Sequence, residues 1–202
     1  MIDVAVIDSG GANLASLAHA LERQGVHASV TEDPATISAA DRVILPGVGS
    51  AAAIMTKLRD RKLVEVICAL RQPVLGICLG MQILFDHSAE GDTQTLGLIP
   101  GRIGRLSPAE GLAVPHMGWN TVSIGVDDPL LTGIDGSDWF YFVHSFHAMA
   151  DSPEVIATTD YGIRFAAIVR RNNFYGVQFH PERSARSGAK LLANFMQRVP
   201  CN

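Results

Sequence analysis

The 202 residues are 48% hydrophobic, carry a formal net charge of −4 and include three cysteines (Cys68, Cys78 and Cys201) without metal-binding spacing. The length and hydrophobic content suit one globular domain, residues 1–202, and leave no apolar run long enough to span a membrane. The negative charge argues against binding to nucleic acid or to an anionic membrane surface. The number and spacing of the cysteines argue against a disulfide framework and a zinc site. The chain begins directly with a strand-like segment instead of a basic, cleavable signal peptide, so we expect a cytoplasmic protein.

The first half of the sequence alternates expected strands and helices. An apolar face recurs from Leu14 to Leu21, which predicts a helix with Asn13 as its cap and Gly25 at its end. A longer helical segment, broken near Arg61, occupies residues 51–71. The expected strands are residues 4–7, 27–31, 43–45 and 74–77. This alternation predicts an α/β fold with a doubly wound parallel sheet.

The second half has a different character, because short apolar runs are separated by proline and glycine. Such spacing is typical of hairpins and predicts an antiparallel extension of the sheet. A closing helix follows, with Leu191, Leu192, Phe195, Met196 and Val199 along one stripe. The expected strands are residues 102–106, 120–124, 139–143, 155–159, 166–170 and 174–179.

A nucleophile-elbow pattern lies at the centre of the chain, in Gly76-Ile-Cys78-Leu-Gly80. An apolar strand precedes it, and residues 81–84 are expected to form the first turn of a helix. The two glycines allow a sharp turn that exposes Cys78 at the carboxyl end of the sheet, where a helix dipole favours the thiolate. The alternative is a buried cysteine in an ordinary strand-to-helix turn.

A base and an acid for this thiol are expected near the end of the last strand, in His180-Pro-Glu182. Residues two apart in an extended segment point the same way, so both side chains can face one pocket. A histidine oriented by a carboxylate is what a thiol nucleophile requires. The alternative is a histidine at a sheet end beside a solvated glutamate.

The loop Pro46-Gly-Val48-Gly49 ends a neighbouring strand, at the edge of the sheet where the elbow lies. Its glycines let a backbone N–H approach a substrate closely and supply a second oxyanion donor. The alternative is a plain strand-to-helix turn. Gly10-Gly11 does not have the spacing of a dinucleotide site, and no third ligand accompanies His144 and His147. We therefore expect no cofactor and no metal.

Taken in this order, the elbow, the glycine loop and the His-Pro-Glu segment resemble those of the class I (triad-type) glutamine amidotransferases. The resemblance covers essentially the whole chain and implies a flavodoxin-like fold, with a central, mostly parallel sheet flanked by helices. Within the family, the chain is similar to the glutaminases that serve imidazole glycerol phosphate synthase in histidine biosynthesis. The segments that carry this likeness are residues 8–14, 45–50, 78–82 and, as the most specific, 115–120.

The resemblance implies a role for each matching position. Cys78 would attack the side-chain amide of glutamine and form a thioester, with His180 as base and acid and Glu182 holding the histidine tautomer. The backbone amides of Val48 and Leu79 would form the oxyanion hole. Five positions would hold the glutamine: Gly49, Gln82, Glu90, Ser145 and Phe146.

A partner subunit is expected because ammonia released into neutral water is mostly protonated and no longer nucleophilic. The glutaminase accounts for all 202 residues, which leaves none for an acceptor site. By resemblance the partner is a (β/α)₈ barrel cyclase subunit, docked over the Cys78 edge to give a heterodimer. The residues expected at or near the contact are Asn13, His116, Met117, Trp119 and Asn120. The alternative for residues 115–120 is an ordinary strand with a buried tryptophan.

The sequence departs from the family in two places. Ser9 and Gly10 stand where an aromatic residue usually follows Asp8, and Phe146 stands where a tyrosine is usual, so its hydroxyl is missing. Other readings stay open at this stage. They are a glutaminase of another ammonia-using synthase, a hydrolase of γ-glutamyl compounds, a non-catalytic regulatory subunit and a structural domain with coincidental motifs.

Overall fold

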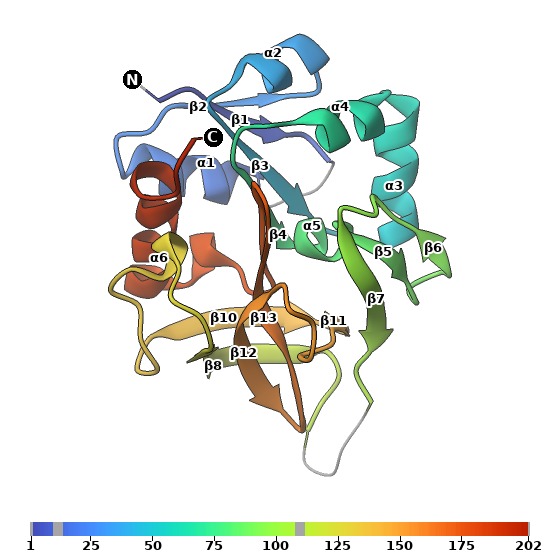
Figure 1. Ribbon diagram of the computed structural model, residues 1–202, viewed down its shortest axis with the longest axis vertical. Helices are drawn as coiled ribbons and strands as arrows, with labels where there is room; N and C mark the ends of the chain where they lie inside the picture. Colours follow the sequence, from blue (N-terminus) through green and yellow to red (C-terminus); the bar gives the residue numbers. More distant parts are fainter. Residues whose placement is uncertain (1, 10–13, 108–111, 202) are drawn as a thin grey trace.

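The computed structural model describes residues 2–9, 14–107 and 112–201, and every structural statement below refers to this part of the chain. Its centre is a sheet of eight described strands in the order β2-β1-β3-β4-β14-β13-β12-β9 (Figure 1). The first five run parallel, and the last three continue the sheet antiparallel. Their bounds are β1 Val4–Ile7, β2 Ala28–Thr31, β3 Arg42–Gly47, β4 Val74–Cys78, β9 Ser123–Ile124, β12 Val155–Tyr161, β13 Ile163–Arg171 and β14 Phe174–Val177.

Two smaller sheets pack beside the antiparallel end of the central sheet. One is a two-stranded ladder, and the other has four strands in the order β11-β7-β5-β6. The ladder pairs β8 (His116–Thr121) with β10 (Trp139–His144). The strands of the other sheet are β5 Phe85–Ser88, β6 Thr93–Gln94, β7 Ile99–Arg105 and β11 Phe146–Ala148.

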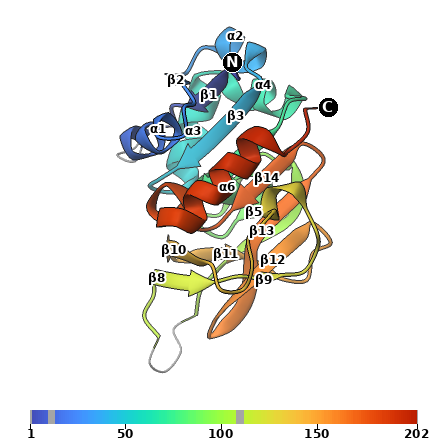
Figure 2. The same ribbon diagram turned by 90° about the vertical axis from the view of Figure 1, so that its left-hand side faces the viewer.

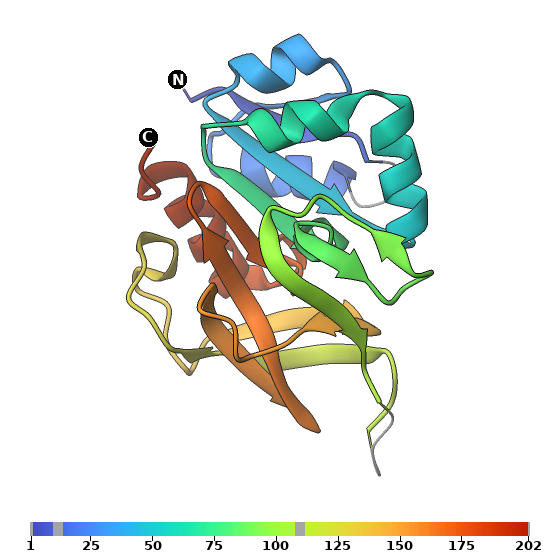
Figure 3. The ribbon, with the colours of Figure 1, turned by 45° about the vertical axis from the view of Figure 1, so that its right-hand side comes forward.

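Helices cover both faces of the parallel half. Residues of α1 and α6 share one buried cluster with β1, β3 and β4, and Figure 2 views the molecule from this side. Residues of α2, α3 and α4 share a second cluster with the opposite face, where Figure 3 brings α3 and α4 forward. The bounds are α1 Leu14–Glu22, α2 Pro34–Ala39, α3 Ala51–Asp60, α4 Leu63–Ala69, α5 Leu79–Gln82 and α6 Ala185–Gln197, with short 3₁₀ turns η1 Pro129–Leu131 and η2 Pro181–Arg183. None of the described helices combines the length and the apolar character needed to cross a bilayer.

The predicted doubly wound α/β class, the break near Arg61 and the buried stripe of α6 are confirmed, except that Val199 is buried beyond the end of the helix. The predicted antiparallel extension is confirmed by β13, β12 and β9. It does not include the strands expected at 102–106 and 139–143, because β7 and β10 belong to the two smaller sheets. The strand expected at 120–124 is divided between β8 and β9, which belong to different sheets. Helix α2 was not predicted, although Asp33 caps it and Pro34 opens it. Asn13, the expected cap of α1, lies outside the described residues.

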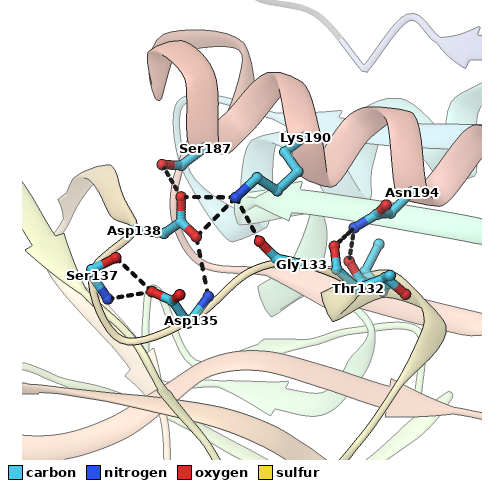
Figure 4. Close-up of polar contacts among 9 residues, drawn as sticks. Thr132, Gly133, Asp135, Ser137, Asp138, Ser187, Lys190 and Asn194 are labelled. Carbon is cyan, nitrogen blue, oxygen red and sulfur yellow. Dashed lines mark hydrogen bonds and ion pairs between the residues drawn. The ribbon is translucent and has the colours of Figure 1, made fainter.

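The loop before β10 is attached to α6 by side chains of both (Figure 4). The Asp138 carboxylate accepts a hydrogen bond from Ser187 at 2.6 Å and pairs with Lys190 at 3.2 Å. Asn194, one helical turn further, donates to the backbone oxygens of Leu130 and Thr132. Because β10 begins at the next residue, these contacts fix where the strand starts on its way to the edge of the parallel sheet.

Candidate active site

The carboxyl ends of three neighbouring strands meet at one edge of the sheet. Gly47, at the end of β3, pairs with Cys78 at the end of β4, and Val177 of β14 pairs with Ile77 on the other side of β4. The glycine loop, the elbow and the His-Pro-Glu segment each follow one of these ends. Residues about a hundred positions apart in the sequence are therefore neighbours in space.

The elbow turns as sharply as the two glycines predict. Cys78 has φ 54° and ψ −109°, a conformation that non-glycine residues rarely adopt and that is held only by surrounding structure. A Cβ on Gly80 would lie 1.8 Å from the carbonyl oxygen of Leu45, and one on Gly76 would lie 2.7 Å from the carbonyl oxygen of Gly80. The two strands and the turn thus pack backbone against backbone, and this packing fixes the direction of the Cys78 side chain.

The helix after the elbow begins before the expected residues 81–84 and does not continue beyond its first turn. Helix α5 has four residues, and the chain then enters β5, a strand that was not predicted. A single turn aligns few peptide dipoles, so it contributes little to a thiolate at its amino end. The stabilisation of an anion at Cys78 must come from neighbouring side chains.

His180 lies between Cys78 and Glu182 and bonds to both. Its Nδ1 is 2.8 Å from Oε1 of Glu182, and the two side chains are only 7% and 2% exposed. With Nδ1–H donated to the carboxylate, Nε2 is the ring nitrogen left for the sulfur. Burial disfavours a charged imidazole, but the hydrogen bonds and charges of Cys78 and Glu182 outweigh it and raise the His180 pKa to about 10. The arrangement therefore favours an imidazolium between the sulfur of Cys78 and the carboxylate of Glu182.

A cavity of about 520 Å³ opens beside the sulfur. Its wall includes the three elements described above and the segment between β10 and β11. It also includes every residue expected to bind the glutamine or its oxyanion: Val48, Gly49, Leu79, Gln82, Glu90, Ser145 and Phe146. A buried thiol with a base and a carboxylate, at the wall of a largely apolar cavity that contains a few polar groups, is suited to acyl transfer.

A family model described as glutamine amidotransferase class-I matches residues 5–199. The chain belongs to the class I glutamine amidotransferases. Two solved structures share the fold of this amidotransferase. The first is a putative GMP synthase subunit from Thermoplasma acidophilum, with a TM-score of 0.76 and 19% identity; the alignment covers 98% of this chain and 94% of that chain. The second is PurLQS from Thermotoga maritima, with a TM-score of 0.70 and 20% identity; the alignment covers 98% of this chain and 99% of that chain.

Curated relatives of the amidotransferase are much more similar in sequence. The imidazole glycerol phosphate synthase subunit HisH of Idiomarina loihiensis is 51% identical over 201 residues, which cover 99% of this chain and 100% of that protein. The protein of the same name from Haemophilus influenzae is 48% identical over 200 residues, with coverage of 99% and 100%. The likeness therefore extends over whole chains.

Two contacts hold the glycine loop of the amidotransferase in place. Ser9, which replaces an aromatic residue of the family pattern, donates its hydroxyl to the carbonyl of Pro46 at 2.6 Å. On the other side of the loop, the Glu90 carboxylate accepts the backbone N–H of Ala51, the first residue of α3, at 2.7 Å. The departure at Ser9 thus has a structural role of its own beside Val48.

Several residues of the site were not predicted from the sequence. Pro115, Val143 and Arg183 line the cavity, and Gln178 is fully buried within hydrogen-bonding reach of Cys78. Gln178 stands two residues before His180, so the alternation that links His180 with Glu182 would also have identified it. Val143 reaches the site on β10, which pairs with β8 and whose Tyr141 carbonyl accepts the backbone N–H of His180. A single sequence gives no signal for such long-range contacts.

The residues expected at a partner contact fall on opposite sides of the β8–β10 ladder. Met117 and Trp119 are 63% and 49% exposed, whereas His116, one position away, is 2% exposed and points inward. Asn120 donates its side-chain amide to the carbonyl of Asp160. A direct contact is thus open to Met117 and Trp119, while His116 can act on a partner only through the ladder.

His116 forms a hydrogen-bonded pair with His144, with Nδ1 of the first 3.0 Å from Nε2 of the second. Nδ1 of His144 is in turn 2.8 Å from the carbonyl oxygen of Phe146, which accepts only. His144 therefore carries its proton on Nδ1 and accepts from His116. Burial lowers the pKa of His116 to about 4 and that of His144 to about 3, so both rings are neutral. In the described part of the chain, no three His, Cys, Asp or Glu residues gather as metal ligands would.

Proposed function

We propose that this chain is the glutaminase subunit of an imidazole glycerol phosphate synthase, which hydrolyses glutamine and passes the ammonia to a cyclase partner. Relatives of that name, 48–51% identical over their whole length, support the assignment. The observation that carries the chemistry is the bridge that His180 makes between Cys78 and Glu182 at the cavity wall.

The first half of the reaction forms a thioester. The Cys78 thiolate attacks the side-chain carbonyl carbon of glutamine, and the oxygen takes up the negative charge. The backbone N–H groups of Val48 and Leu79 stabilise this oxyanion. His180 gives its Nε2 proton to the amide nitrogen, the C–N bond breaks, and ammonia leaves.

The second half releases glutamate. The now neutral His180 removes a proton from a water molecule as its oxygen attacks the thioester carbon. The tetrahedral intermediate collapses, the C–S bond breaks, and the sulfur departs as the thiolate beside a protonated imidazole. Glu182 accepts the Nδ1–H throughout and keeps the ring oriented.

The polar groups of the cavity match the two ends of an amino acid. Glu90 is the carboxylate at the wall and pairs with the substrate ammonium. The oxygen of Gln82 and the backbone at Gly49 assist it. The backbone of the segment Ser145-Phe146 faces the substrate carboxylate, and Phe146 has no hydroxyl to add a hydrogen bond.

The partner docks on the outer face of the β8–β10 ladder, beside the mouth of the cavity. Met117, Trp119 and Trp139 lie on this face and are 49–63% exposed, and an exposed apolar patch of this kind is typical of a protein interface. Arg183 stacks on Tyr141 at 4.4 Å and adds a charge at the rim. We expect the partner to be a (β/α)₈ barrel whose acceptor site opens toward Cys78, so that ammonia does not enter the solvent.

Replacement of Cys78 by alanine tests the nucleophile. In the complex with the cyclase partner, Cys78→Ala should abolish glutamine-dependent product formation, while added ammonium salt still supports it at the wild-type rate. Alanine adopts the strained backbone at this position as well as cysteine does, so the fold should be retained. The matched control is Cys68→Ala, at an exposed cysteine outside the site, which should keep both activities. Glutamine turnover that survives Cys78→Ala would overturn the proposal.

A further inference from the structure

Gln178 is a fully buried side chain that touches the reacting sulfur and has no part in the mechanism above. Its amide nitrogen is 3.8 Å from Sγ of Cys78, and its amide oxygen is 3.0 Å from Nε2 of Gln82. It enters from the residue directly after β14, between Val177 and Phe179. The nucleophile therefore has two polar neighbours on this segment, His180 and Gln178.

The orientation of the Gln178 amide follows from a backbone carbonyl. The oxygen of Phe146 can only accept, and the Gln82 amide group that faces it at 2.8 Å must therefore be the NH₂. The same nitrogen faces Gln178, so Gln178 must present its oxygen there. This leaves the NH₂ of Gln178 directed at the sulfur. A rotated amide would place two NH₂ groups against each other and an oxygen against a thiolate.

A fixed N–H donor beside a sulfur stabilises the anion more than the thiol, because a negative acceptor makes the stronger hydrogen bond. The effect is enhanced here since Gln178 is 0% exposed and Cys78 only 8%, so water competes poorly for the sulfur. In the proposed mechanism His180 is protonated both when the thiolate attacks and when it leaves the thioester. Gln178 therefore adds a second N–H donor to the same sulfur, and it gives up no hydrogen in either step.

We propose that Gln178 is a further catalytic residue, whose carboxamide N–H stabilises the Cys78 sulfur as a thiolate when it attacks the amide and again when it leaves the thioester. The inference rests on the proposed function in one respect, namely that Cys78 is the nucleophile. No proton moves to or from Gln178 in either step. Gln82 is its positioning residue, since both hydrogens of the Gln82 amide are used to hold Phe146 and Gln178.

The test is the pH dependence of Cys78 alkylation by iodoacetamide in the full-length chain, followed by peptide mass spectrometry. Gln178→Met keeps the length of the side chain and removes the donor. We expect the pH of half-maximal alkylation to rise by about one unit, which is roughly a tenfold shift of the equilibrium between thiol and thiolate. The limiting rate at high pH should stay the same. In the complex, kcat for glutamine should fall by about the same factor with little change in KM.

Two further variants complete the experiment. Gln197→Met makes the same substitution at an exposed residue of α6 and should leave the alkylation profile unchanged. Gln82→Met keeps the Gln178 donor but frees its orientation, so a smaller rise is expected. An unchanged profile in folded Gln178→Met overturns the proposal, and if that variant does not fold, an unchanged profile in Gln82→Met does so.

The exposed cysteines separate failure of this inference from failure of the proposed function. Cys68 and Cys201 serve as internal references in the same digest. If wild-type Cys78 reacts no faster than these two at neutral pH, the nucleophile itself is wrongly assigned. If wild-type Cys78 is reactive and Gln178→Met is equally reactive, only the role of Gln178 is refuted.

Discussion

Replacing His116 by phenylalanine measures how a neutral buried histidine contributes to the free energy of unfolding and to its pH dependence. The ring of His116 stacks on Tyr161 at 3.9 Å and on Phe142 at 4.9 Å between centroids, and phenylalanine retains this stacking. The substitution removes the hydrogen bond to His144 and the titratable group. Loss of the hydrogen bond should lower the free energy of unfolding by about 1–2 kcal/mol at neutral pH.

The pH dependence should then favour the variant in acid. Burial lowers the His116 pKa to about 4 in the folded chain, whereas an unfolded histidine titrates near about 6.5. As the pH falls from about 7.5 to about 5, the unfolded state takes up a proton that the folded state does not, and stability is lost. Over this pH range the difference in proton uptake between the unfolded and folded states sums to about 1.4 pH units, which lowers the free energy of unfolding by about 2 kcal/mol. The wild type should lose this amount and His116→Phe should not, so the two stabilities converge or cross.

Urea denaturation at several pH values between these limits measures the effect. Carboxylates, His144 and His180 are present in both proteins, so their contributions largely cancel in the difference. His27→Gln, at a histidine that is exposed in the folded chain, is the matched control and should leave the difference constant. A constant gap between wild type and His116→Phe from neutral pH to about pH 5 would refute a neutral His116 in the folded state.

Two predictions concern the elbow and the partner face. Gly80→Ala should lower the free energy of unfolding by at least about 4 kcal/mol in thermal or urea denaturation, because the added Cβ would lie 1.8 Å from the backbone oxygen of Leu45. The control is Gly136→Ala, where the added Cβ would have nothing within 4 Å, and this variant should unfold like the wild type. Equal stability of both variants would contradict the backbone packing described for the elbow. Trp119→Ala should weaken binding of the cyclase partner by about 2 kcal/mol, which calorimetry would record as a roughly thirtyfold higher Kd. The control is Val30→Ala, at an exposed residue of β2 on the far edge of the main sheet, which should leave the Kd unchanged. Unchanged affinity of Trp119→Ala would exclude the β8–β10 ladder as the docking face.

The sequence predicted those features that local patterning encodes. The alternation of strands and helices gave the parallel half of the sheet, and the glycines around Cys78 gave the elbow. The i, i+2 spacing put His180 and Glu182 on one side. Each of these depends on residues close together in the chain, for which backbone geometry alone decides the outcome.

What the sequence did not reveal depends on long-range pairing. The neutral pair of His116 and His144 exists because β8 and β10 pair in a register that sets these two residues opposite each other. Spacing alone relates His144 to His147, yet the two rings bond to different backbone oxygens, those of Phe146 and Ala148. Strand β5 was missed because Phe85 to Ser88 pairs in parallel with β7, which lies beyond a hairpin.

Strand β14 has a consequence for how the enzyme is made. It is the last strand along the chain, yet it lies between β4 and β13 and joins the parallel and antiparallel halves of the sheet. During synthesis β4 and Cys78 leave the ribosome well before β14. The strand β4 therefore lacks its neighbour β14, and Cys78 lacks His180, until the end of the chain has been made. A partly synthesised chain therefore has the thiol of Cys78 without His180 and Glu182 beside it. By the mechanism proposed above, glutamine hydrolysis would begin only after β14, the last of the described strands, has entered the sheet.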